Sequence, residues 1–161
     1  MMKTITYKQI TEKDLSEYEA FMLPMIYEEL LQQSCIEENY IALAAIDEDT
    51  SLGVVIAEPE DGGDINLLSI WTAMDRRREG IASGLLQKMT EVARALYKWD
   101  DGQYGDDITL KTMYCLDDRY RKIYEAWLEK NGFTDFMVMR DETEDRPDIC
   151  GATAEIHFYR W

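Results

Sequence analysis

A run of arginines and glycines near the middle of the chain has the residue types that hold a phosphate. Residues 75–86 read Asp-Arg-Arg-Arg-Glu-Gly-Ile-Ala-Ser-Gly-Leu-Leu, so that the three arginines from Arg76 onward precede two glycines. Side chains at Gly80 and Gly84 would hold an anion away from the backbone, which is a reason for glycine at both positions. If a helix begins here, its unpaired N–H groups and the positive end of its dipole attract the same anion. The stretch therefore predicts a binding site for a phosphate or a pyrophosphate.

The segments on either side predict a strand before this turn and a helix after it. In residues 65–72 both alternating sets of side chains are largely apolar, as expected of a central strand that is covered on both faces. Residues 81–97 place apolar side chains at helical spacing, which predicts an amphipathic helix. These apolar positions are Ile81, Ala82, Leu85, Leu86, Met89, Val92, Ala93 and Leu96.

The N-terminal part of the chain predicts one strand, two helices and a hairpin. Residues 3–10 alternate like a strand, and residues 11–14 resemble a capping box with Asp14 in place of the usual Glu or Gln. Pro24 suits the first turn of a second helix. The inner faces of the two helices are expected at Leu15, Tyr18, Phe21 and Met22, and at Ile26, Tyr27, Leu30 and Leu31. A polar turn at residues 47–50 joins two strand runs into a hairpin, 40–46 and 51–57.

The C-terminal part predicts a polar loop, three strands and one helix. The loop covers residues 99–107, and the strands are expected at 108–116, 136–139 and 153–159. Asp117 or Asp118 would cap the helix between the first two of these strands. The inner face of this helix is expected at Tyr120, Ile123, Tyr124, Trp127 and Leu128. The charged loop between the last two strands carries Pro147 and Gly151.

The order of these elements, β-αα-β-β-β-α-β-α-β-β, predicts an α/β sandwich around one twisted sheet. With 161 residues, of which 46% are apolar, the chain is expected to form one domain over residues 1–161. No stretch reaches the roughly 18 consecutive apolar residues of a membrane span. Residues 1–6 lack the apolar core of a signal peptide, so no association with a membrane is expected.

Charge and cysteine usage narrow the functional classes further. A formal net charge of −16 argues against nucleic-acid binding through a basic face. The three cysteines, Cys35, Cys115 and Cys150, are far apart and in no metal-ligand spacing, and His157 is the one histidine. These residues predict reduced thiols in a cytoplasmic protein that has no metal site.

The segment from Arg77 to Ala82 resembles the (Gln/Arg)-x-x-Gly-x-(Gly/Ala) signature of the GNAT superfamily of N-acetyltransferases. The order of elements is similar to the GNAT order over nearly the whole chain. Gly132 and Phe133 close a later helix, as is common in that family, and Gly132 stands where a left-handed residue would end it. The resemblance implies a mixed, mostly antiparallel twisted sheet of about seven strands with about four helices. It also implies that the sheet splays beside the signature turn and admits the pantetheine arm of acetyl-coenzyme A.

The resemblance further implies which residues would contact acetyl-coenzyme A. Backbone contacts to pantetheine and to the thioester carbonyl would fall on Ile70, Thr72 and Met74. The pyrophosphate would be wrapped by Arg77, Arg78, Gly80, Ile81, Ala82, Ser83 and Gly84. Tyr124 is a further candidate for a contact along the cofactor.

Acetyl transfer to an amine needs a neutral amine and a proton for the departing thiolate. Many relatives carry a tyrosine four residues before the Gly-Phe pair, but this chain has Leu128 there, which has no proton to give. The base is equally open: Asn66 holds a position where some relatives have a carboxylate, and the other candidates are Glu60, Asp64 and Asp117. A water chain would serve in place of any side chain. The catalytic residues are therefore unassigned from the sequence.

Three functions compete on this basis. The first is a cytoplasmic N-acetyltransferase, a monomer or a homodimer, acting on a primary amine of a small molecule or a peptide. The second is a non-catalytic acyl-CoA-binding regulatory domain of the same fold. The third, another phosphate-ligand binder, is weakened because no nucleotide-binding glycine motif is present. Acidic residues crowd the loops, so a cationic acceptor is expected, with a merely solvated acidic surface as the alternative.

Overall fold

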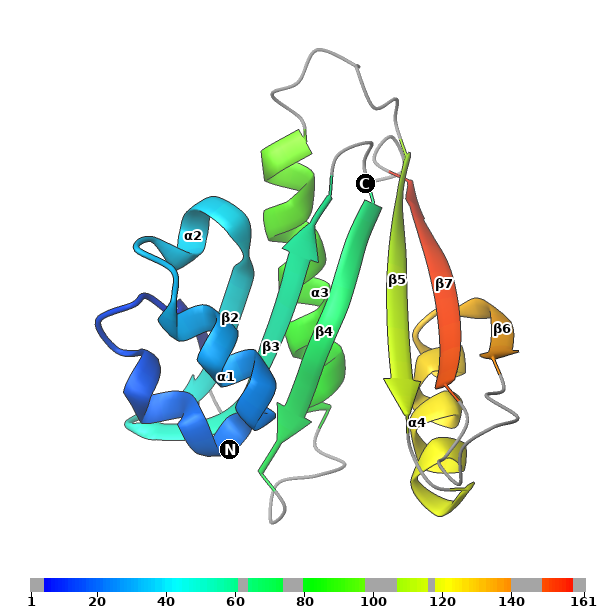
Figure 1. Cartoon of the computed structure of the whole chain (residues 1–161), viewed down its shortest axis with the longest axis horizontal. Coiled ribbons are helices and arrows are strands. Elements are labelled where there is room, and N and C mark those ends of the chain that lie inside the picture. Colours follow the sequence, from blue (N-terminus) through cyan, green and yellow to red (C-terminus); the bar gives the residue numbers. More distant parts are fainter. Residues whose placement is uncertain are drawn as a thin grey trace. The chain divides into compact units, whose positions relative to one another are not determined.

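The structure is a computed structural model that describes residues 5–60, 64–73, 80–97, 107–115, 118–139 and 149–157 (Figure 1). The chain divides into two compact units, each of which is described by itself. The first unit comprises Met1–Pro59 and Leu67–Asp101, and the second comprises Glu60–Asn66 and Gly102–Trp161. That residues 1–161 act as one domain stays a prediction.

An antiparallel sheet forms the frame of the first unit. Strand β1 (Ile5–Gln9) pairs with β2 (Ile41–Asp47), and β2 pairs with β3 (Thr50–Pro59). The turn between β2 and β3 places Asp47 opposite Thr50, with Glu48 at a φ of 56°, which confirms the predicted hairpin. β4 (Asp64–Thr72) follows β3 and runs in the opposite direction (Figure 1).

Three short helical segments connect β1 to β2. They are a 3-10 helix η1 (Leu15–Phe21), α1 (Pro24–Leu31) and α2 (Ile36–Asn39). Leu15, Tyr18 and Leu30 are buried as expected, and Pro24 opens α1. Leu31 is 57% exposed, which contradicts its predicted place on the inner face. A helix of eight residues packs along one narrow stripe, and Leu31 lies about a third of a turn beyond the buried Leu30. The sequence did not predict α2, whose single turn is too short to show a period.

The predicted capping box before η1 is only half formed. The carboxylate of Asp14 accepts hydrogen bonds from the backbone N–H of Thr11 at 2.7 Å and from its hydroxyl at 3.0 Å. Because the Thr11 hydroxyl donates to Asp14, it does not cap a helical N–H, and η1 has no side-chain cap. Lys8 also pairs with Asp14, at 2.9 Å. Burial by itself raises the pKa of Asp14, but the hydrogen bonds from Lys8 and Thr11 together lower it below its ordinary value.

Helix α3 (Ile81–Tyr97) covers one face of this sheet, with the bounds that the sequence predicted. Ile81, Leu85, Leu86, Met89 and Ala93 are buried, and Gln87 and Glu91 are exposed on the other side. The opposite face packs against η1, α1 and α2 through a cluster that includes Ile10, Leu30, Ile36, Ala44 and Ile56.

The second unit holds β5 (Asp107–Cys115), α4 (Asp118–Lys130), β6 (Thr134–Met139) and β7 (Ile149–His157). β7 lies between β5 and β6 and is antiparallel to both. Gly151 was expected in a loop but lies in β7, because β7 pairs with β5 along its whole length and starts opposite Cys115. Ile123 was expected on the inner face of α4 but is 64% exposed, since the buried side of the helix is the one that carries Leu128.

The described elements occur in the predicted order, with α2 added. Among the helices described, none combines the length and the apolar character that a membrane crossing requires. Several predicted features lie outside the described residues: Met74, Arg76, Arg77, Arg78, the loop segment 98–106, Asp117 and Pro147.

Candidate cofactor site

The start of α3 is open in the way that an anion site requires. Gly80 precedes the helix with a φ of +77°, a left-handed conformation that glycine adopts without strain. Among the described residues, none has an atom within 4 Å of the position that a Cβ at Gly80 would take, so none of them fills the space beside this backbone. In any α-helix the first four N–H groups have no partner within the helix, and here these groups belong to residues 80–83. The turn therefore presents backbone donors and the positive end of a 17-residue helix on one open side.

Gly84 has a packing role in the structure, and its contact with a cofactor stays a prediction. Its N–H donates to the carbonyl of Gly80 at 2.9 Å and closes the first turn of α3. The position that a Cβ would occupy is taken by the hydroxyl of Tyr7 in β1. Gly84 thus lets Tyr7 lie against the first turn of α3, and its own N–H is already used.

Gly53 in β3 allows the start of α3 to pack close to the sheet. A Cβ at Gly53 would lie 2.5 Å from the carbonyl oxygen of Trp71, 3.2 Å from Leu85 and 3.3 Å from Ile81. Ile81 and Leu85, in the first two turns of α3, therefore pack directly against the backbone of β3 at Gly53. The sequence analysis missed this residue, although a glycine inside a strand is a known signal of close approach.

β4 contains a β-bulge. The N–H of Glu60 donates to the carbonyl of Asp64 at 2.7 Å, and the N–H of Ala73 donates to the carbonyl of Leu52 at 2.8 Å. Between these two bonds the β3 side advances eight residues, from Leu52 to Glu60 just beyond the strand, whereas the β4 side advances nine, from Asp64 to Ala73 just beyond that strand. One extra residue in β4 accounts for the difference.

The packing of β4 places the bulge near Ile70. Leu68 packs against the cluster beneath η1 and α1, and Trp71 meets Phe21 of the same cluster edge-on, with ring centroids 4.6 Å apart. In a regular strand, residues three apart point to opposite faces. Leu68 and Trp71 reach the same side, so the alternation changes between them. A bulge disrupts the ladder locally, and it does so here in the segment where backbone contacts to a ligand were predicted.

Tyr124 lies in the second unit, inside a group of aromatic side chains. Its hydroxyl is 3.1 Å from that of Thr112, and its ring meets Tyr114 edge-on and stacks on Trp127, with centroids 4.9 and 5.9 Å away. Burial raises the pKa of Tyr124, against the smaller lowering effect of the Thr112 hydrogen bond. The side chain is therefore neutral at physiological pH, and its contact with a cofactor stays a prediction.

Leu128 is a core residue. It is fully buried, and its carbonyl accepts a hydrogen bond from the N–H of Phe133 at 3.0 Å. The position at which many relatives carry a tyrosine is thus filled by an apolar side chain that offers no acid.

Two of the candidate bases share one cation. The ammonium of Lys111 in β5 lies 2.8 Å from a carboxylate oxygen of Asp64 and 3.4 Å from one of Glu60. The amide of Asn66 donates to the other oxygen of Glu60. The hydrogen bond with Asp64 is the main reason that the pKa of Lys111 is raised. In the described parts of the chain no group of three or more His, Cys, Asp or Glu side chains is placed to hold a metal ion.

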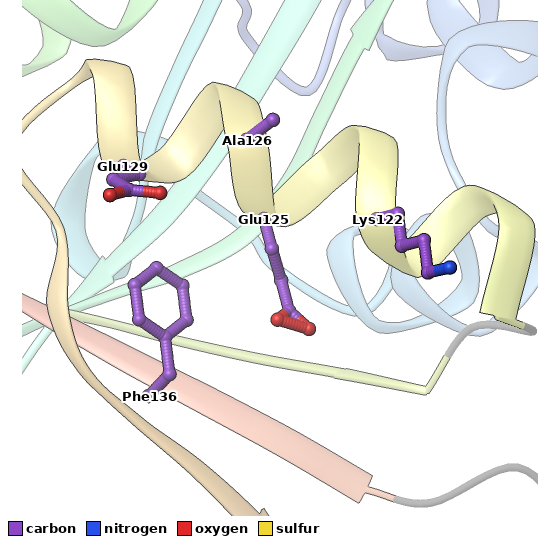
Figure 2. Close-up of a pocket in the computed structure, with 5 residues that line it drawn as sticks. All are labelled: Lys122, Glu125, Ala126, Glu129 and Phe136. Carbon is purple, nitrogen blue, oxygen red and sulfur yellow. The ribbon is translucent and has the colours of Figure 1, made fainter.

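A separate hollow of about 410 Å3 lies between α4 and β6. Figure 2 shows the Phe136 ring directed toward α4, with the carboxylates of Glu125 and Glu129 beside it. Lys122 and Ala126 are the other described residues of its lining, and none of these five was predicted to contact the cofactor. The hollow also lacks the helix start and the glycines that make the turn before α3 suitable for an anion.

Comparison with known proteins supports an acyltransferase fold. Residues 7–101, more than half of the chain, match a family model described as "Acetyltransferase (GNAT) family". No curated protein matches the sequence.

Similar solved structures extend the comparison to nearly the whole chain. The ribosomal-protein-S18-alanine N-acetyltransferase of Escherichia coli is 16% identical with a TM-score of 0.68, over 96% of this chain and 95% of that one. An aminoglycoside 6'-N-acetyltransferase complexed with coenzyme A is 15% identical with a TM-score of 0.64, over 93% and 96%. The diaminobutyrate acetyltransferase of Paenibacillus lautus is 13% identical with a TM-score of 0.60, over 95% and 96%. At these identities the structures show the fold alone, and together with the family match they confirm the predicted α/β sandwich.

Proposed function

Because the chain belongs to the GNAT family of acetyltransferases, we propose that it moves an acetyl group from acetyl-coenzyme A to a primary amine. The observation that carries the proposal is the open start of α3, which packs on Gly53 of β3 and follows the bulged strand β4 in the sequence. A helix start alone would suit many anions. A bulged strand leading into it adds backbone groups for the arm that joins the pyrophosphate to a thioester.

In this proposal the pyrophosphate binds at the N–H groups of residues 80–83, and the arginines Arg77 and Arg78 add charge-assisted hydrogen bonds. Gly84 keeps Tyr7 against the helix and contributes no N–H. The arm follows β4, where peptide groups of Ile70, Thr72 and Met74 contact it and hold the thioester carbonyl. Tyr124 is proposed as an apolar contact farther along the cofactor.

The chemistry asks this chain to manage two protons, one leaving the amine and one reaching the thiolate. Glu60 and Asp64 stand at the start of the same strand that carries Ile70, and they are the described carboxylates proposed to take the amine proton through water. Leu128 supplies no acid. The thiolate then takes its proton from water, from another tyrosine or from the amine itself.

The proposed acceptor is a cationic amine, such as a polyamine, an aminoglycoside or a basic peptide end. The net charge of −16 supports this choice, because an acidic surface attracts cations over a Debye length. Two similar structures are named for amine acceptors of this kind, an aminoglycoside and L-2,4-diaminobutyric acid. A second candidate, a non-catalytic acyl-CoA-binding domain, is favoured only by the apolar Leu128.

A screen for coenzyme A release tests the proposal. The protein is mixed with acetyl-coenzyme A and a panel of cationic, neutral and anionic amines, and free thiol is measured. We expect release with cationic amines and mass increase of the acceptor by one acetyl group. Calorimetric binding of coenzyme A without release by any amine would favour the non-catalytic domain, and absence of both would refute the assignment.

A further inference from the structure

Tyr7 in β1 lies against the first turn of α3, and both elements belong to the first compact unit. Tyr7 pairs with Ala45 across the β1–β2 ladder, and directly opposed residues of an antiparallel pair project to the same face. The neighbouring Ala44 packs into the cluster beneath η1 and α1, so Ala45 and Tyr7 belong to the other face, which α3 covers. There the Tyr7 hydroxyl takes the position that a Cβ at Gly84 would occupy.

The glycine at position 84 has two competing explanations. Next to proline, glycine is the least favoured residue in a helix, so its presence as the fourth residue of α3 needs a reason. One reason is a bound anion, which a side chain would hold away from the backbone. The other is Tyr7, whose hydroxyl leaves no room for a Cβ. The second explanation is favoured because the N–H of Gly84 already donates to the carbonyl of Gly80 at 2.9 Å.

The Tyr7 contact acts on the part of α3 that is proposed to bind the pyrophosphate. In an α-helix each Cα–Cβ bond tilts toward the N-terminus, so the Cβ position of Gly84 lies toward the preceding turn. That turn contains Gly80 and Ile81, whose N–H groups have no partner within the helix. The Tyr7 ring is rigid, and its carbon Cζ lies 3.6 Å from the same Cβ position. A side chain at Gly84 would therefore displace either the Tyr7 ring or the turn that carries the proposed donors.

We propose that Tyr7 is a positioning residue of the cofactor site, which holds the first turn of α3 in the conformation that binds the pyrophosphate, and that residue 84 is a glycine in order to admit the Tyr7 hydroxyl. The proposal rests on the acetyltransferase function above, and it adds a residue of β1 to a site otherwise built from β4 and α3. Tyr7 does not touch the reacting atoms. It acts through the backbone of the helix.

The test is a double-substitution cycle with Gly84→Ala and Tyr7→Phe, in which coenzyme A affinity is measured by calorimetry. Gly84→Ala alone should weaken binding roughly tenfold, because the added Cβ overlaps the Tyr7 hydroxyl and displaces the first turn. Tyr7→Phe alone should keep the affinity within about threefold, because the ring still lies against the turn. The double variant should recover the wild-type affinity to within about threefold, because the new Cβ then meets the ring carbon Cζ at 3.6 Å, an ordinary van der Waals distance.

Tyr27→Phe is the matched control, since it removes a hydroxyl from α1, on the opposite face of the sheet. Combined with Gly84→Ala, it should restore no affinity. The proposal is overturned if a folded Gly84→Ala protein binds coenzyme A as tightly as the wild type. It is also overturned if the affinity lost in Gly84→Ala does not return with Tyr7→Phe, because the glycine would then serve the anion itself.

Hydrogen exchange of the ligand-free protein separates this proposal from the acetyltransferase function. The amide at position 84 closes the first turn, so its protection factor should fall roughly tenfold in Gly84→Ala and return in the double variant. If the wild type bound no coenzyme A, the acetyltransferase function would fail. The exchange rates would still decide whether Tyr7 holds this turn, and equal protection in all variants would show that it does not.

Discussion

The start of α3 and the end of α4 share one backbone feature and use it in opposite ways. Gly80 and Gly132 both have a left-handed φ, +77° and +91°, and a Cβ at either would meet no atom of the structurally described segments within 4 Å. At Gly132 the chain folds back on the helix. The N–H groups of Gly132 and Phe133 donate to the carbonyls of Glu129 and Leu128, at 3.2 and 3.0 Å. This is the Schellman pattern, and it satisfies the helix end from within the chain.

At Gly80 the polarity of the helix is reversed, so the groups left over are donors. No residue within α3 can accept from the first N–H groups of this helix. At the end of α4, Leu128 and Phe133 are both buried, so Gly132 contributes to folding there. The comparison indicates that a left-handed glycine at a helix end is a candidate for ligand binding only where the helix leaves its own backbone groups without internal partners.

The largest expected effect comes from a carboxylate at the open helix start. Gly80→Asp places a negative charge where the pyrophosphate is proposed to bind, and two charges about 4 Å apart interact by about 4 kcal/mol at an effective dielectric constant of about 20. We expect coenzyme A affinity, measured by calorimetry, to fall at least about a hundredfold. Gly132→Asp is the matched control, since it adds the same side chain at the same kind of φ. Equal affinities of the two folded variants would refute the site.

A truncation at the closed helix end should instead act on stability. Leu128→Ala removes a fully buried side chain, and such changes destabilise proteins by about 2 to 5 kcal/mol. We expect a loss of this size in urea unfolding, with the affinity of the folded protein for coenzyme A kept. Ile123→Ala, on the exposed side of the same helix, should change stability by less than about 0.5 kcal/mol. Similar losses in both variants would contradict the assignment of Leu128 to the core.

A smaller substitution, at Gly53 beneath α3, tests whether the packing of this helix affects coenzyme A binding. Gly53→Ala would place a Cβ about 2.5 Å from the Trp71 carbonyl oxygen, so the helix start or β4 must shift. We expect a loss of about 1 to 3 kcal/mol of stability, as for overpacked cores, and weaker coenzyme A binding in the folded fraction. Thr50→Ala, at an exposed position of the same strand, is the control. Unchanged coenzyme A affinity in Gly53→Ala would show that the distance between the start of α3 and β3 does not affect cofactor binding.

The smallest effect concerns the proton of Tyr124. Its pKa is raised by burial, so the folded protein holds this proton more tightly than the unfolded chain. The corresponding stability is fully present below about pH 10, the ordinary pKa of tyrosine, and is lost as the pH rises through the raised value. Tyr124→Phe should therefore flatten the alkaline fall in stability, measured by urea unfolding between about pH 9 and pH 11. A steeper fall in the variant would contradict the burial of this hydroxyl.

The sequence by itself determined the elements that have a clear local signal. The 17 residues of α3 show their period over several turns, the polar residues 47–50 mark a hairpin, and Gly132 marks a helix end. The helix start after Gly80 was predicted as well, whereas the place of the arginines before it lies outside the described residues. Each of these signals depends on residues close together in the chain, which is why reasoning from the sequence predicted them.

Only the tertiary structure decided which side chains of these elements are buried and which distant residues they contact. The burial of Leu128 beside the exposure of Leu31 and Ile123 depends on where the sheet meets each helix. The extra residue in β4 is found only by comparing the number of residues in β4 with the number in the paired β3. The reason for a glycine at position 84 is found only from its contact with Tyr7. Lys111 meets Glu60 across more than fifty positions of chain. Such contacts carry no local pattern, because they arise from pairing and packing between segments that the sequence keeps apart.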